Sequence, residues 1–183
     1  FAPIAAASGL SFYQRPAELA SNSATNDDFA LDFINKVQCD ILVQVNPTSP
    51  FTKAEDIRAL VDMFIQGQYK TVHTVKEEQI EGLFNGKPLN FDPEKQMPPS
   101  QELTPVQLFT SSIMAGDCAN FRQNMAQHGC AVSGGAQKTG YYVLQGEGMI
   151  DFDHDKDFYL AESLFAWKSQ TMEMPYYDMW CKC

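Results

Sequence analysis

The 183-residue chain has the length and composition of one globular domain, with 44% hydrophobic residues. Lys and Arg number 13 against 23 Asp and Glu, so the formal net charge is −10, which argues against binding of nucleic acid along a basic face. No apolar run approaches the roughly 20 residues that a membrane-spanning helix needs. We therefore expect a single domain over residues 1–183 that has neither nucleic acid nor a membrane as a partner.

The cysteines and the first residues bear on the cellular compartment. The five cysteines are an odd number without zinc-ligand spacing, which predicts free thiols in a reducing compartment. No charged segment precedes an apolar core at the start, so no signal peptide is predicted. We expect a cytoplasmic protein.

The start of the chain predicts a truncated domain. Residues 1–8 are typical of the last turns of a helix, with Gly9 at the C-terminal capping position. Phe1 is not an initiator Met. We therefore expect residues 1–183 to be one domain that is N-terminally truncated.

Strand and helix patterns alternate along the rest of the chain. They predict, in order, a short strand at 10–13, a helix that opens at 26–28, a strand at 41–45, a helix that Thr52 and Glu55 begin as a capping box, a strand at 71–75, a hairpin turn at 85–86, a loop at 93–105, strands at 106–114, 141–144 and 149–152, and a helix at 158–168. Residues 41–45 are almost entirely apolar, which is typical of a strand inside a parallel sheet. The order predicts a three-layer α/β/α domain whose sheet is mainly parallel, with 41–45 in its interior.

The acidic segment Asp151-Phe-Asp153-His-Asp155-Lys-Asp157 is the strongest local signal for chemistry. In an extended segment, Asp151 and Asp153 point the same way. Mg²⁺ takes one or two carboxylates together with phosphate oxygens and waters, so this pair is a candidate metal site. Two alternatives stay open: a solvated turn in which Asp157 only caps the last helix, and a calcium loop of the EF-hand kind that ends at Glu162.

A second candidate site is the loop Asn46-Pro47-Thr48-Ser49-Pro50, directly after the predicted buried strand. Ligands of open α/β sheets bind outside the carboxyl ends of the strands. The two prolines stiffen this loop, and Thr48 and Ser49 offer hydroxyls. The same residues would equally suit a plain connection. Arg15, taken alone, is a surface cation, and no glycine-rich phosphate loop of the Walker or Rossmann type is present.

Four collinear segments resemble the acylneuraminate cytidylyltransferases, also called CMP-sialic acid synthetases. Arg15-Pro-Ala-Glu-Leu-Ala-Ser21 is similar to the R-P-x-E-L-A-S segment of that family, and Ile41-Leu-Val-Gln-Val-Asn46-Pro-Thr-Ser-Pro50 to its strand with a Q-P-T-S-P loop. Ala54-Glu-Asp-Ile57 continues the likeness. Residues 149–162 resemble its S-I-D-I-D-x-x-x-D-x-x-x-A-E ending.

The resemblance implies a nucleotide-diphospho-sugar-transferase-like fold and a set of roles. Asp151 and Asp153 would hold Mg²⁺ and serve catalysis, and the substrate-binding positions would be Arg15, Thr25, Asn26, Asn46, Thr48 and Ser49. The implied reaction joins CTP and a sialic-acid-type sugar acid into a CMP-sugar with release of pyrophosphate. The resemblance also leaves a homodimer open.

The sequence departs from the family in three places. Ser100 stands where the family has a sugar-facing Arg, and residues 110–114 replace N-G-A-I-Y. Nothing corresponds to the N-terminal strand and the Arg-, Gly-, Ser- and Lys-bearing loop that hold the triphosphate. We therefore expect this fragment to be inactive alone, and a non-catalytic binding or scaffolding relative is the alternative function.

Overall fold

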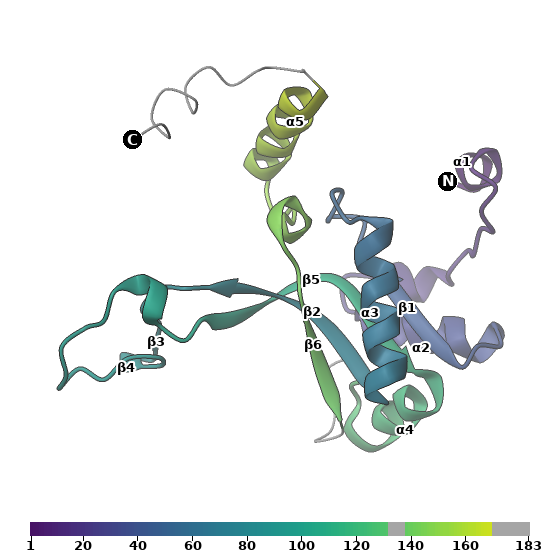
Figure 1. The fold of residues 1–183 in the computed structure, drawn as a ribbon. Helices are drawn as coiled ribbons and strands as arrows, with labels where there is room; N and C mark the ends of the chain where they lie inside the picture. The colour runs from purple at the N-terminus through teal and green to yellow at the C-terminus, as the bar shows by residue number, and fades with distance from the viewer. Residues whose placement is uncertain (132–137, 170–183) are drawn as a thin grey trace.

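The computed structural model describes residues 1–131 and 138–169. Their elements, in chain order, are α1 (Ala2–Ala7), η1 (Ala17–Ala20), α2 (Asn26–Lys36), β1 (Ile41–Val45), α3 (Ala54–Gly67), β2 (Thr71–Glu78), β3 (Leu83–Phe84), β4 (Lys87–Pro88), η2 (Ser100–Glu102), β5 (Val106–Asp117), α4 (Cys118–His128), β6 (Thr139–Val143), η3 (Gly146–Met149) and α5 (Asp155–Ser169). Figure 1 shows their arrangement. None of the helices within these ranges is long and apolar enough to cross a membrane.

The central sheet has the strand order β1-β5-β2-β6. Strand β5 pairs antiparallel with both β1 and β2, while β2 and β6 pair in parallel. Strands β1, β2 and β6 therefore run in one direction, and β5 runs against them. The expected mixed α/β sheet with mainly parallel strand directions is confirmed.

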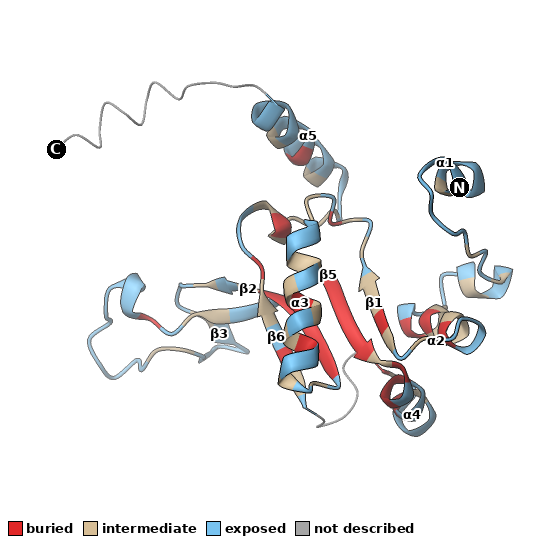
Figure 2. Ribbon diagram, turned by 45° about the vertical axis from the view of Figure 1, so that its right-hand side comes forward, coloured by how far each residue is buried: buried red, intermediate tan, exposed pale blue. Residues whose placement is uncertain are grey.

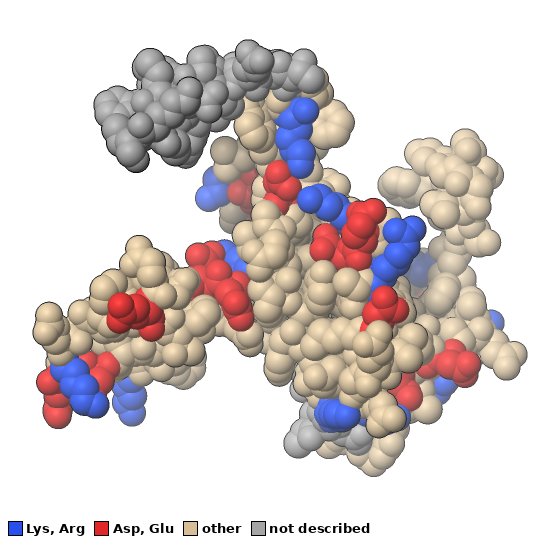
Figure 3. All heavy atoms as spheres, in the orientation of Figure 1, with Lys and Arg blue, Asp and Glu red and all other residues tan. Residues whose placement is uncertain are grey.

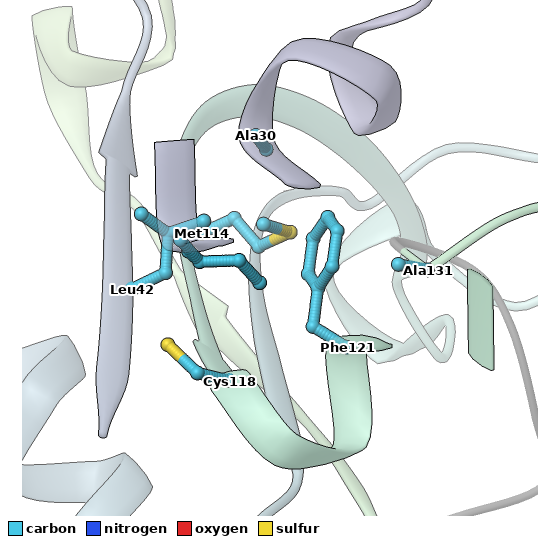
Figure 4. Packing of buried hydrophobic residues seen from close by; sticks show 7 residues of the cluster. Ala30, Leu42, Met114, Cys118, Phe121 and Ala131 are labelled. Atoms are coloured by element: carbon cyan, nitrogen blue, oxygen red, sulfur yellow. The ribbon is translucent and has the colours of Figure 1, made fainter. Parts of the chain in front are cut away.

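Helices cover both faces of this sheet, which gives the expected three layers (Figure 1). On one face Leu60 and Phe64 of α3 pack with Val72 of β2 and with Ile113 and Ala115 of β5. On the other face, α2 and α4 close a second cluster over β1 and β5. Figure 4 shows the seven buried side chains of this cluster and labels Ala30, Leu42, Met114, Cys118, Phe121 and Ala131. Because successive residues of β5 alternate between the two clusters, this one strand joins both halves of the core.

The expectation that residues 41–45 lie in the sheet interior is wrong. Among the described strands, β1 is at one end of the sheet, and only Leu42 of its five residues is buried. The longest buried runs belong to the two inner strands, Ser112 to Gly116 of β5 and Thr71 to Val75 of β2 (Figure 2). The apolar residues of a short strand indicate that helices cover the faces of the sheet there. They do not indicate whether the strand has one neighbouring strand or two.

Two predicted strands are not strands. Tyr13 packs edge-on against Phe33 at a centroid distance of 5.3 Å and donates a hydrogen bond to Asp32, so residues 10–13 lie along α2 instead of joining the sheet. Residues 149–152 follow the short helix η3, and the N–H of Phe152 donates to the carbonyl of Thr48 at 3.0 Å. That bond joins two loops rather than two strands.

Helix boundaries differ from the sequence patterns in two further places. Lys53, not Thr52, is the N-cap of α3, and it makes no capping bond; the Thr52 hydroxyl is buried without a hydrogen-bond partner among the described residues. Helix α4 was not predicted, although its signals are present. Asp117 accepts a capping bond from the N–H of Asn120, and Gly129 ends the helix with φ 68°.

The hairpin and the terminal helices agree with the predictions. Asn85 and Gly86 both have positive φ, at 49° and 75°, as a two-residue turn between β3 and β4 requires. The hairpin projects away from the central sheet (Figure 1). Gly9, with φ 69°, follows α1, and α5 begins three residues before the predicted start.

Candidate functional site

A cavity of about 570 Å³ lies beside β1, on the face of the sheet that α2 covers. Its wall comes from α2 and the segment before it, from β1 and the loop that follows, and from β2 and β5 where these two strands pair irregularly. The residues that line it include Arg15, Asn26, Phe29, Phe33, Asn46, His73, Thr74, Phe109 and Ser111. The cavity is thus bounded by parts of the chain that lie far apart in sequence.

The start of α2 forms the first end of the cavity. Thr25 caps this helix: its hydroxyl accepts the N–H of Asp28 at 3.2 Å, while the Asp28 carboxylate accepts the N–H of Thr25 at 2.8 Å. These bonds to Thr25 lower the pKa of Asp28. The cap fixes Asn26 and Phe29 at the cavity wall, and the guanidinium of Arg15 lies 5.8 Å from the centre of the Phe29 ring.

The loop after β1 is held by its own backbone. The N–H of Asn46 donates to Ser112 of β5 at 2.9 Å, and the carbonyl of Asn46 accepts the N–H of Ser49 at 3.1 Å. Ser49 is buried, and its hydroxyl donates to Asp151 at 3.4 Å. Asn46 therefore lines the cavity from a rigid turn, and Ser49 faces the acidic segment instead.

A bulge between β2 and β5 forms the second end of the cavity. The ladder pairs His73 with Met114 and next pairs Val75 with Phe109, so β5 has extra residues here. The buried hydroxyl of Thr74 bridges the bulge by accepting the N–H of Ile113 and donating to its carbonyl, both at 3.0 Å.

The bulge presents an unusual backbone and an aromatic pair to the cavity. Ser111 has φ 56°, in the left-handed region that L-residues seldom adopt. His73 is 7% exposed, and its ring packs edge-to-face on Phe109 at a centroid distance of 5.3 Å. Phe109 in turn packs edge-to-face on Tyr141 at 5.9 Å. The Phe109 ring is therefore one of the neighbours against which the imidazole packs.

The acidic segment lies beside the loop and outside the cavity wall. Asp151 accepts bonds from Ser49 and from the N–H of Phe152, the latter at 3.0 Å. Asp157 accepts the N–H groups of Asp153 and His154, and the bonds from these groups, that of His154 first, lower its pKa. Asp157 is thus the third residue of α5 instead of the residue that precedes the helix, and its carboxylate reaches back to the N–H groups before the first turn.

The EF-hand alternative is wrong. Helix α5 starts at Asp155, so the middle and end of the supposed calcium loop, up to Glu162, are helical. Within the described parts of the chain, no group of three or more His, Cys, Asp or Glu side chains lies close enough to hold a metal ion. The two-carboxylate Mg²⁺ site predicted from Asp151 and Asp153 is smaller than such a group and stays a prediction.

The structure brings together some of the predicted site residues and separates others. Arg15, Asn26 and Asn46 line the one cavity. Thr25, Thr48, Ser49, Asp151 and Asp153 do not line it. Thr25 caps α2, Thr48, Ser49 and Asp151 belong to the contact between the loop and the acidic segment, and the N–H of Asp153 donates to Asp157.

His73, Phe109 and Ser111 were not predicted as site residues. Their positions follow from the bulge, which only the pairing of β2 with β5 reveals. One signal was present in the sequence, since residues 110–114 depart from the family pattern at this point.

Solved structures of two enzymes share this fold. The 4-diphosphocytidyl-2C-methyl-D-erythritol synthase from Anaerococcus prevotii matches with a TM-score of 0.55 and 13% identity, over 79% of this chain and 68% of that chain. The 2-C-methyl-D-erythritol 4-phosphate cytidylyltransferase from Thermus thermophilus matches with a TM-score of 0.51 and 13% identity, over 86% and 80%. No protein-family model matches the chain. At this level of identity, the likeness shows the fold alone.

Proposed function

We propose that this domain is a cytidylyltransferase that activates a sialic-acid-type sugar acid with CTP. One observation carries the proposal: Arg15, Asn26 and Asn46, which the family resemblance implies as substrate-binding residues, come from three separate segments and line one cavity. The fold is shared with one enzyme named as a cytidylyltransferase and one named as a diphosphocytidyl-methylerythritol synthase, which supports the same class of reaction. The cytidylyltransferase acts, by name, on a polyol phosphate rather than a sugar acid.

The cavity is suited to a nucleotide at the α2 end. Arg15 supplies a cation, Phe29 and Phe33 supply aromatic surface for a base or ribose, and Asn26 supplies an amide. Asn46, at the carboxyl end of β1, occupies the place where ligands of open α/β sheets bind. In this arrangement Asn46 would contact the sugar next to the nucleotide.

The acidic segment fits a Mg²⁺ ion. Asp151 uses one carboxylate oxygen, Oδ1, for its two hydrogen bonds, and the Asp153 carboxylate takes part in no hydrogen bond or ion pair with the described residues. When bound, Mg²⁺ would neutralise charge on the phosphates of CTP. Asp151 and Asp153 would hold the ion, with waters and phosphate oxygens as its remaining ligands.

The reaction needs positioning more than covalent chemistry. The anomeric hydroxyl of the sugar attacks the α-phosphorus of CTP, a new phosphorus–oxygen bond forms, and pyrophosphate leaves. The chain would contribute by holding the two substrates in line and by keeping cationic and amide groups near the transferred phosphate.

Pyrophosphate release tests this proposal. The natural full-length protein is supplied with CTP, Mg²⁺ and either N-acetylneuraminate or 2-C-methyl-D-erythritol 4-phosphate. We expect release with the sugar acid, and Arg15→Ala should lower kcat/KM by at least tenfold, which corresponds to about 1.4 kcal/mol. Arg58→Ala is the control, since Arg58 is an exposed arginine on α3 whose nearest acidic partner is Glu55 at 3.9 Å.

The outcomes separate the candidate functions. Release with the polyol phosphate alone would keep the class of enzyme and replace the acceptor. Binding of CTP without release of pyrophosphate from either acceptor would favour the non-catalytic relative. Absence of CTP binding would refute the proposal.

A further inference from the structure

We propose that His73 and the bulge at Ser111 form an anion-binding end of the cavity, which takes the negatively charged group of the acceptor. The acceptor identity rests on the proposed function, whereas the anion site itself is argued from the cavity. Neither residue belongs to the motifs that carry the family resemblance.

The charge of the cavity wall differs from that of the protein. The chain has a formal net charge of −10, and Figure 3 shows acidic side chains over the body and over the projecting arm that carries the hairpin. Among the described residues that line the cavity there is no Asp or Glu, and the ionisable side chains are those of Arg15 and His73. A cavity wall without carboxylates in an acidic protein favours an anionic ligand, because an anion meets no like charge on this wall and a cation finds no carboxylate partner there.

His73 brings a nearly buried imidazole to the cavity wall. It lines the cavity while 7% exposed, and Phe109 holds its ring edge-to-face at 5.3 Å. An imidazole can donate a hydrogen bond whether it is neutral or protonated. A hydrogen bond from a fixed donor to a charged acceptor is worth more than one between neutral groups.

The bulge adds a second polar group at the same end. Ser111 lines the cavity from a left-handed backbone conformation with φ 56°, which the buried hydroxyl of Thr74 sustains through its bonds to Ile113. No hydrogen bond joins the Ser111 hydroxyl to the described residues. Backbone strain of this kind collects at ligand sites, where the surrounding structure enforces it.

The two ends of the cavity therefore suit different parts of a reaction. Arg15 and the aromatic side chains of α2 form one end, while His73 and Ser111 form the other, and Asn46 lies on the loop after β1. A nucleotide at the first end would leave the second end for the acceptor. A carboxylate of a sugar acid and a phosphate of a polyol phosphate share the required negative charge.

Histidine ring resonances give a direct test that needs neither CTP nor turnover. These 183 residues contain three histidines, and in ¹H–¹³C spectra each of them gives its own imidazole signal to follow. His73→Gln identifies the His73 signal by its loss. N-acetylneuraminate and 2-C-methyl-D-erythritol 4-phosphate are titrated separately into the natural full-length protein, and His128 and His154, both exposed, serve as internal controls.

We expect a saturable shift of the His73 signal, with little change at His128. Calorimetry on His73→Gln should show affinity for the effective probe reduced about tenfold, the usual loss for one hydrogen bond to a charged group. His128→Gln should bind like the wild type. A response to the sugar acid alone assigns a carboxylate, and a response to the polyol phosphate alone assigns a phosphate.

Two results would overturn the inference: no saturable His73 shift with either probe, or unchanged affinity in His73→Gln. Failure of the proposed function has a different signature, namely no pyrophosphate release while the His73 signal still responds. The two failures are therefore distinguishable in one set of samples.

Discussion

Replacement of Thr74 by valine should collapse the bulge that shapes the second end of the cavity. Thr74 is 1% exposed. Its hydroxyl takes part in three hydrogen bonds, with the N–H and the carbonyl of Ile113 at 3.0 Å each and with the hydroxyl of Thr110 at 2.8 Å. Valine has nearly the same shape and no hydroxyl. The substitution therefore removes the bonds without opening a cavity.

The expected loss of stability follows from these bonds. A buried hydrogen bond contributes about 1 kcal/mol net, so three bonds suggest a loss of about 3 kcal/mol. With an m-value of about 2 kcal/mol/M in urea, the midpoint of unfolding should fall by roughly 1.5 M. Because Ser111 would relax with the bulge, the affinity for an anionic probe should fall as well.

Urea unfolding followed by circular dichroism measures the first effect, and calorimetry at low denaturant measures the second. Thr74→Ser is the matched control, since it keeps the hydroxyl and removes one methyl group, at a cost of about 0.8 kcal/mol. The reasoning is refuted if the unfolding midpoints of Thr74→Val and Thr74→Ser differ by less than 0.2 M urea, which is about 0.4 kcal/mol at that m-value. The hydroxyl would then not hold the bulge.

Further expectations concern the core, the acid stability and a buried thiol. Leu60→Ala should lower the free energy of unfolding by about 2–5 kcal/mol because Leu60 is 0% exposed, whereas Ile65→Ala, at 56% exposure on the same helix, should change it by less than about 1 kcal/mol in thermal unfolding. Although burial opposes it, bonds from the N–H of Asn120 and from Lys70 lower the pKa of Asp117. A carboxyl whose pKa is lowered by folding stabilises the fold at every pH above its pKa in the unfolded chain, which is about 3.9. The difference in unfolding free energy between wild type and Asp117→Asn should therefore be constant near neutral pH and shrink as the pH falls below about 4. Burial raises the pKa of Cys118 to about 12, so iodoacetamide at pH 8 should label Cys130 long before Cys118, as read by peptide mass spectrometry; equal rates would contradict this.

A metal prediction belongs with these. Asp153→Asn should abolish Mg²⁺-dependent CTP binding in calorimetry, whereas Asp155→Asn, two residues further on in the first turn of α5, should leave it intact. Unchanged binding in Asp153→Asn would exclude the role of this carboxylate.

Local patterns predicted the elements that carry their own signals. The hairpin turn at Asn85 and Gly86, the strand at 41–45 and the layered α/β order all depend on short-range chemistry, and the structure has them. The position of β1 at the end of the described sheet depends on which strand pairs with which. Nothing within five residues encodes that choice.

The residues of the candidate site also differ in whether local sequence patterns could predict them. Asn46 could be anticipated because a loop after an apolar strand is a common ligand position. His73 could not, because its place in the cavity depends on a bulge formed with residues more than thirty positions away. Thr25 shows the opposite case: its residue type suits both a ligand and a helix cap, and in the structure it is the cap.

The loop after β1 is the physical link between the cavity and the acidic segment. Asn46 faces the cavity, while three residues later Ser49 donates to Asp151, and the Thr48 carbonyl accepts the N–H of Phe152 at 3.0 Å. A movement of this loop must therefore shift the cavity wall and the Asp151 carboxylate together. Since the backbone of the loop is bonded to β5 through Ser112, the strand that joins both core clusters also fixes the spacing between the two parts of the site. A reaction that depends on the distance between a bound sugar and a metal-bound phosphate needs such a connection, because misplacement by about 1 Å can cost a hundredfold in rate.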